Sequence, residues 1–289
     1  MSQTVASIGD LLRTWREQRH LSQLDLAVEA DISQKHLSFV ESGRSAPSRD
    51  MVLLLAEHLD VPLRERNAML LAAGFAPVFR NRPLNDPALA RAMASIDRLL
   101  KAHEPYPALT VDRHWNMVAA NAAVTPLLVA VDPELMKPPV NVLRASLHPR
   151  GLAPLIVNLP EWRGHLLDRL KRQWRITRDP VLDKLLQELT AYPTAARLAS
   201  ARPPAGATEE IAVPLKLRTQ RGTLSFLSTV TVFGTPVEIT LSELTLEAFY
   251  PADPETLAIL QEGLLPAPLP AQATTRLRSR DVPPARGST

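Results

Sequence analysis

The stretch Leu21–Ser48, LSQLDLAVEADISQKHLSFVESGRSAPS, contains two short predicted helices with a tight turn between them. Ser22 is a candidate N-cap for the first helix, and Asp25, three residues later, supplies the acid of a capping box. Ser33 can cap the second helix. Gly43 suits the left-handed residue that commonly follows the end of a helix. The stretch therefore carries start and stop signals for two consecutive helices.

The second helix of this stretch can be phased from its own residues. Leu37, Val40 and Glu41 share one face, so at about 100° per residue the remaining side chains point away from that face. The outward residues are Lys35, Ser38, Phe39 and Ser42, with Gln34 at the helix start. An outward phenylalanine would fit a surface that meets apolar groups, such as the thymine methyl groups in a DNA major groove.

Apolar spacing around this stretch predicts a small helical domain. In the first helix, Leu24, Ala27 and Val28 form a stripe at i, i+3 and i+4, which predicts its buried face. Further helices are predicted over residues 8–20, 49–59 and 62–73, the last framed by Pro62 and Gly74. Five helices in the first 75 residues would complete a domain.

The stretch Leu21–Ser48 resembles the helix-turn-helix of the xenobiotic-response-element (XRE) class of repressors. The longer run VESGRSAPSRDMVLLLAEHLDVPLRERNAMLLAAGFAP, residues 40–77, resembles the MmyB-like subfamily. In that subfamily a PAS-like ligand-binding domain follows the DNA-binding domain. The resemblance extends over roughly residues 8–262.

The resemblance implies roles for individual residues of the helix-turn-helix. Gln23 would touch a DNA phosphate, and Glu41 would pair with Arg16 of the preceding helix. The residues expected to face base edges are Gln34, Lys35, Ser38 and Phe39. Residues 1–75 contain eight Lys or Arg against ten Asp or Glu, so attraction to phosphate must come from local placement of Lys35, Arg44 and Arg49. The alternative is two ordinary amphipathic helices without DNA contact.

Composition sets bounds on the whole chain. Its 289 residues suggest two domains, and 45% hydrophobic content supports a buried core. The formal net charge is a mild +3. No run of about eighteen apolar residues predicts a membrane span, and no secretion signal is recognisable at the N-terminus. Without cysteine, disulfides and thiolate metal sites are excluded. We therefore expect a cytoplasmic protein.

The rest of the chain divides into three segments by its residue composition. Residues 76–87 predict a linker, in which Arg80 and Arg82 belong either to a solvated hinge, the favoured interpretation, or to an arm that contacts the DNA backbone. Residues 88–264 form the predicted PAS-like domain. Residues 265–289 are rich in Pro, Ala, Ser, Thr and Arg and are predicted to be disordered.

Strand signals predict a five-stranded antiparallel sheet in the second domain. A hairpin over residues 108–119 comes first, with Trp115 in place of the usual turn glycine. Asp112 and Asn121 are expected to fix the turn and the following helix start. Three later strands are predicted at Ile211–Arg218, Thr223–Phe233 and Val237–Leu246, punctuated by turn residues. The expected fold class is α+β, a five-helix lambda-repressor-like domain followed by this PAS-like domain.

A pocket between sheet and helices could hold a ligand, although packing is the default role of each apolar side chain. The candidate polar anchors lie near a loop-to-helix junction and are Arg144, His148, Asn158, Trp162 and His165. The subfamily resemblance implies an elongated, fatty-acid-like effector. No haem, flavin or other cofactor and no metal site is expected, and the sequence lacks the usual motifs of hydrolases, phosphate-binding enzymes and metalloproteases.

Together these features predict a bacterial-type transcription regulator. A homodimer is expected on a palindromic double-stranded operator, with a small hydrophobic ligand bound by the second domain. One alternative is a DNA-binding regulator whose C-terminal domain is a ligand-free protein-interaction module. Another is an enzyme regulated by DNA binding.

Overall fold

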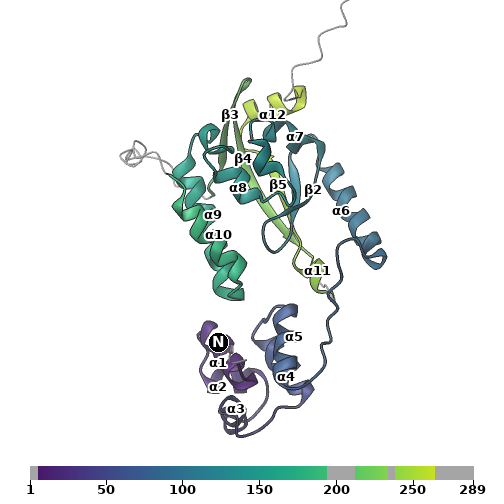
Figure 1. The fold of residues 1–289 in the computed structure, drawn as a ribbon, viewed down its shortest axis with the longest axis vertical. Coiled ribbons are helices and arrows are strands. Elements are labelled where there is room, and N and C mark those ends of the chain that lie inside the picture. The colour runs from purple at the N-terminus through teal and green to yellow at the C-terminus, as the bar shows by residue number, and fades with distance from the viewer. Residues whose placement is uncertain (1–5, 194–211, 234–237, 264–289) are drawn as a thin grey trace, which may run out of the picture.

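The computed structural model describes residues 6–193, 212–233 and 238–263. A helical N-terminal part lies at one end, and a larger part built around a sheet lies at the other (Figure 1). The predicted tail at 265–289 and the predicted turn at 234–236 fall outside the described residues.

Five helices make up the N-terminal part, as predicted. They are α1 Ile8–Gln18, α2 Gln23–Glu29, α3 Gln34–Glu41, α4 Arg49–His58 and α5 Leu63–Ala72. Four of them start at a serine N-cap whose hydroxyl accepts a backbone N–H three residues on: Ser7, Ser22, Ser33 and Ser48. Gly43 follows α3 with φ +71°, the left-handed conformation expected after a helix end.

The predicted buried face of α2 is wrong in part. Leu26 and Ala27 are buried, whereas Leu24 is 54% and Val28 71% exposed. A seven-residue helix has too few positions for spacing alone to fix its phase. Contacts with α3 and α4 turn Leu26 inward, into the core that α1 and α5 complete.

The second part contains the predicted five-stranded antiparallel sheet, in the order β2-β1-β5-β4-β3. The strands are β1 Ala108–Val111, β2 Met117–Ala120, β3 Leu215–Thr219, β4 Gly222–Val232 and β5 Thr245–Pro251. The last strand was predicted at Val237–Leu246, which is wrong. A short helix, α11 Ile239–Ser242, occupies that position because the Glu238 side chain caps it through the backbone N–H of Leu241, at 2.9 Å.

Helices cover both faces of the sheet. They are α6 Ala90–Ala102, α7 Thr125–Leu128, α8 Val142–Leu147, α9 Leu159–Thr177, α10 Pro180–Ala191 and α12 Pro254–Glu262. The short 3₁₀ turns are η1 Pro87–Leu89, η2 Ala122–Val124, η3 Pro133–Met136 and η4 Ala153–Leu155. The α9–α10 pair lies on one side of the sheet and α6 on the other (Figure 1). Because side chains alternate along a strand, Ala248 packs towards α6 while its neighbour Glu247 faces α9.

The segment between the two parts is docked rather than solvated. Arg80 forms an isolated bridge with Glu238, and the Ile239 N–H donates to the Arg80 carbonyl at 2.8 Å. The Arg82 N–H donates to the buried Glu238 carboxylate, also at 2.8 Å. The interpretation of residues 80–82 as a solvated hinge is therefore wrong. None of the helices in the three described ranges has the length and apolar character to cross a bilayer.

Candidate DNA-binding surface and ligand site

The outward face of α3 carries exposed polar side chains and one aromatic ring. Gln34 and Lys35 are exposed, and Ser38 and Phe39 are half-buried. The Lys35 ammonium lies 5.6 Å from the Phe39 ring centroid, and the Arg44 guanidinium lies 5.8 Å from it. Two cations therefore flank the ring, and each is attracted to the face of the ring. The result is a positive rim around an apolar centre.

A buried ion pair holds this helix in place. Arg16 of α1 donates to both Glu41 carboxylate oxygens, at 2.7 and 3.0 Å, and the Glu41 side chain is fully buried. The Gln23 amide of α2 adds a third hydrogen bond, at 2.8 Å. Burial raises the pKa of Glu41, but the hydrogen bonds from Arg16 and Gln23 outweigh it and leave that pKa below the ordinary value.

The remaining predicted DNA contacts lie around α3. Arg44 follows the helix and Arg49 begins α4, and both are exposed. Gln23 is half-buried, with its amide on Glu41. Arg44 therefore lies beside the outward face of α3, and Gln23 is joined to the buried pair that holds this helix.

An apolar cavity of about 90 Å³ lies between the sheet and the helices. Its walls include Trp115, Leu143, Trp162, Leu166, Phe226 and Phe249. Of the five ligand contacts predicted from the sequence, only Trp162 lines this cavity.

The other four predicted ligand residues each contact other groups of the protein. Arg144 pairs with Glu188 at 2.7 Å, and the His148 ring packs edge-on against Tyr192. The Asn158 side chain bonds the backbone of Pro214 and Lys216. His165 stacks on Trp162, outside the cavity lining. Burial, followed by the nearby Arg169, lowers the pKa of His165. These contacts explain the four side chains structurally, without a ligand.

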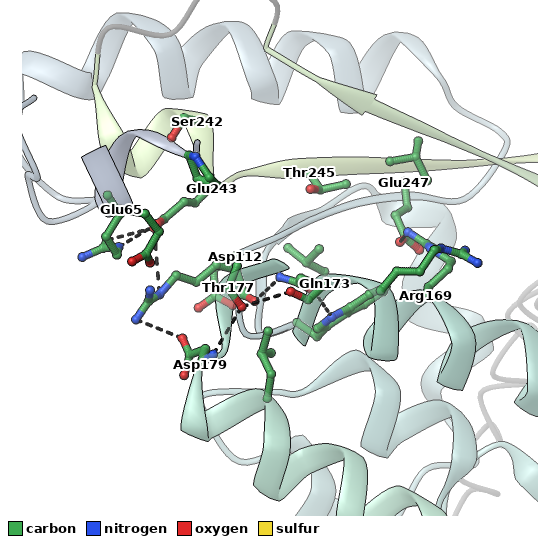
Figure 2. A pocket seen from close by; sticks show the side chains of 18 residues that line it. Glu65, Asp112, Arg169, Gln173, Thr177, Asp179, Ser242, Glu243, Thr245 and Glu247 are labelled. Atoms are coloured by element: carbon green, nitrogen blue, oxygen red, sulfur yellow. Dashed lines mark hydrogen bonds and ion pairs between the residues drawn. The ribbon is translucent and has the colours of Figure 1, made fainter. Parts of the chain in front are cut away.

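A second, larger and polar cavity of about 390 Å³ lies where α5 meets the sheet domain. We call it the junction cavity (Figure 2). Its labelled lining includes Glu65, Asp112, Arg169, Gln173, Asp179 and Glu243. These residues come from α5, the β1–β2 turn, α9 and its C-terminal end, and the segment before β5.

Ion pairs cross the junction. Arg64 of α5 forms two hydrogen bonds with Glu243, at 2.6 and 2.9 Å. Arg113 and His114, in the β1–β2 turn, both reach Asp179, at 3.3 and 2.8 Å. A further contact of 3.9 Å between Arg113 and Glu243 links the two sets, so that α5, the β1–β2 turn and the start of α10 are joined.

The β1–β2 turn is fixed by its own polar residues, as predicted. The Asp112 carboxylate accepts the N–H groups of His114 and Asn116, at 2.8 and 2.9 Å. Asn121 is buried and bonds the backbone of Ala108. Asp112 therefore fixes the turn as predicted, whereas the expected role of Asn121 at the helix start is wrong. Its side chain makes no capping hydrogen bond to η2 and instead bonds the backbone of Leu100, Tyr106 and Ala108.

Two family models match this chain. Residues 12–66 match a helix-turn-helix family, and residues 92–262 match the MmyB-like transcription regulator ligand binding domain. The chain belongs to the MmyB-like transcription regulators. A search of curated proteins found no match.

Within residues 6–193, 212–233 and 238–263, no cluster of three or more His, Cys, Asp or Glu side chains could hold a metal ion. The sequence did not single out the junction residues of this regulator, because Glu65, Asp179 and Glu243 are far apart along the chain. The local signals within the lining were Asp112, expected to fix the turn, and Trp115, in the place of a turn glycine.

Proposed function

We propose that this regulator binds a specific DNA site through α3 and that its C-terminal domain binds a small hydrophobic, fatty-acid-like effector and mediates dimerisation. The observation that carries the DNA assignment is the outward face of α3, held by the buried Arg16–Glu41 pair. The proposed division is a DNA-binding domain at 1–75, a linker at 76–87 and a ligand-binding domain at 88–264.

One recognition helix spans only a few base pairs, which favours a symmetric dimer on two half-sites. A palindromic operator follows from that symmetry. We assign this regulator no catalytic role, because both matched families are those of transcription regulators, and place it in the bacterial cytoplasm with its DNA.

Substitutions on α3 test the DNA assignment. Gln34→Ala or Lys35→Ala should weaken binding to the operator by about 1–3 kcal/mol if the side chains contact bases. Arg44→Ala should weaken all sequences alike and reduce the salt slope of log K by about 0.9, because one phosphate contact is lost. Gel-shift titrations at several salt concentrations measure both effects.

Lys101→Ala is the matched control, since it removes an exposed lysine of α6 far from α3 along the chain. Operator affinity that is the same for wild type, Gln34→Ala and Lys35→Ala would remove both side chains from base recognition. Equal salt slopes for wild type and Arg44→Ala would exclude the phosphate contact.

The sizes of the cavities bear on the effector. Ligand pockets usually measure roughly 300–1,000 Å³. The apolar cavity, at about 90 Å³, is below that range, and the junction cavity, at about 390 Å³, is within it. Taken alone, the small apolar cavity favours the alternative of a protein-interaction module. An effector therefore needs both spaces or an enlarged apolar one.

Native mass spectrometry tests effector and dimer together. A dimer that releases a lipid-sized molecule on denaturation supports both assignments. A monomer at micromolar concentration contradicts dimerisation. A dimer without bound mass, which also fails to bind added fatty acids, supports the interaction module.

A further inference from the structure

The apolar cavity and the junction cavity share a wall. Trp115 and Glu247 line both of them. Along β5, Thr245 borders the junction cavity and Phe249 the apolar cavity, with Glu247 midway between. These three alternate residues point to the same face of the sheet. The two spaces are thus neighbouring compartments of one trough on that face.

Arg169 of α9 completes this wall. Its Nη2 donates to Glu247 Oε1 at 2.6 Å, and its guanidinium lies 4.8 Å from the Trp115 ring centroid. Both charged side chains are largely buried, with exposed fractions of 16% for Arg169 and 7% for Glu247. Figure 2 shows the Arg169 side chain extended from its helix beside Glu247.

The α9 side of the junction cavity carries an excess of positive charge. An arginine side chain has five N–H donors, and within the described parts of the chain Arg169 shows a hydrogen bond only to Glu247. Arg172 lies one turn further along α9 and also lines the junction cavity. Within the described parts of the chain it forms no ion pair. On the opposite side, the carboxylates of Asp179 and Glu243 are paired with cations, and Asp112 accepts backbone N–H groups of its own turn. Glu65, also on that side, shows no ion pair within the described residues.

Trp115 closes the wall in a conformation that costs energy. Its φ of +66° is unusual for a bulky residue. Hydrogen bonds hold it there, including Nε1–H to Gln173 Oε1 at 2.7 Å and the Val142 N–H to the Trp115 carbonyl at 2.9 Å. Strained residues that their surroundings hold in place cluster at ligand clamps and switches.

We propose that the wall is the binding point for an acid group, so that an anionic amphiphile spans both compartments. Its apolar chain occupies the apolar cavity, and its acid group binds the N–H donors of Arg169 that Glu247 leaves unused. This inference rests on the proposed effector function and adds the residue that selects an anionic head. Opening the wall also joins the small compartment to the larger one, which removes the size conflict.

Isothermal titration of the full-length protein at pH 8 tests the assignment. The probes are dodecanoic acid and dodecan-1-ol, which share a chain and differ in head group. The wild type should bind the acid about tenfold more tightly than the alcohol or better, because a hydrogen bond to a charged group adds affinity. Arg169→Gln should remove this preference, so that the acid and the alcohol bind with equal affinity. Arg175→Gln, an exposed arginine on the same helix, should retain the preference.

Glu247→Gln provides a second and independent arm. Removing the competing carboxylate should raise the affinity for the acid several-fold relative to the affinity for the alcohol. If Arg169→Gln does not fold, as judged by its circular dichroism melt, this arm decides, and an unchanged acid affinity overturns the proposal.

The outcomes separate this proposal from the effector function. Equal affinity for acid and alcohol in both wild type and Arg169→Gln would overturn the anchor and preserve the effector site. No binding of either probe to the wild type would contradict the hydrophobic-effector function and the anchor with it.

Discussion

At Glu41, donors from two other helices converge on a carboxylate that solvent does not reach. The side chains are those of Arg16 from α1 and Gln23 from α2. A buried charge costs desolvation energy that only such partners offset. The orientation of α3, and with it the surface proposed to face DNA, therefore depends on side chains buried between the helices.

Arg16→Ala should destabilise the protein by about 3–5 kcal/mol, because it leaves Glu41 buried and without its main partner. Urea unfolding followed by circular dichroism measures the change. Arg49→Ala, an exposed arginine on α4, is the control and should stay within about 0.5 kcal/mol. An unchanged urea midpoint for Arg16→Ala would contradict the role of the pair.

Glu41 also makes the stability of the N-terminal helices depend on pH in the acid range. Its pKa is lowered in the folded state, so its contribution is present above the unfolded value of about 4.3 and is lost as pH falls towards the folded pKa. Glu41→Gln should be less stable at pH 7 and should lose less stability on acidification than wild type. Thermal melts between pH 7 and pH 3 compare the two, and parallel curves would exclude Glu41 as the titrating group.

At the scale of elements, Glu238 joins the linker to the sheet domain. One carboxylate oxygen accepts the Arg82 N–H and the other accepts the Leu241 N–H that begins α11. The same side chain thus caps a helix and fixes the segment that leads from the DNA-binding helices.

Glu238→Ala should release residues 80–82 from α11 and cost about 1–3 kcal/mol, because two backbone donors lose their acceptor. Limited trypsin digestion should then cleave after Arg80 faster than in wild type; Arg82 precedes Pro83, and trypsin does not cut before proline. Glu57→Ala, at an exposed position of α4, is the control. Equal cleavage rates would show that the linker is held by other contacts.

The elements that sequence predicted well have local causes. Serine caps and apolar spacing located all five N-terminal helices, and turn residues separated β3 from β4. The last strand was misplaced because the run 237–246 suits a strand locally. The long-range contacts of Glu238 convert its first half into a helix. The phase of α2 failed because Leu24 and Leu26 are chemically equivalent, and only packing distinguishes them.

The candidate sites divide in the same way. The outward residues of α3 followed from one helical period. The ligand candidates Arg144 and Asn158 were chosen for polarity near a junction, and each proves to have a partner that is distant in sequence. The wall residues Trp115, Arg169 and Glu247 come together only through the sheet and α9, so no local spacing could reveal them.

At the scale of the whole molecule, the junction connects DNA-binding helices and ligand-binding domain through charge. Arg64 forms a hydrogen-bonded ion pair with Glu243, and its neighbour Glu65 lines the junction cavity. Burial raises the pKa of Glu65, and the nearby Arg113 and Arg64 offset this only in part. A charged Glu65 is therefore a weak point in the docked arrangement.

Glu65→Gln should raise the melting temperature at pH 7. A carboxyl whose folded pKa is raised stabilises the fold below its unfolded pKa, and that stabilisation is lost as pH rises through the folded value. The advantage of the variant should therefore vanish below about pH 4.3. Differential scanning calorimetry across pH measures this. Glu57→Gln is the matched control, and a pH-independent difference would show that Glu65 does not titrate at the junction.

The indole of Trp115 also makes the wall visible to spectroscopy. The sequence has four tryptophans, so Phe at Trp15, Trp162 and Trp174 would leave one emitter. That emitter lies under a guanidinium and donates its Nε1–H to Gln173. Losing either contact would change its emission colour and lifetime. Stopped-flow fluorescence could then time the opening of the trough independently of any measurement on DNA.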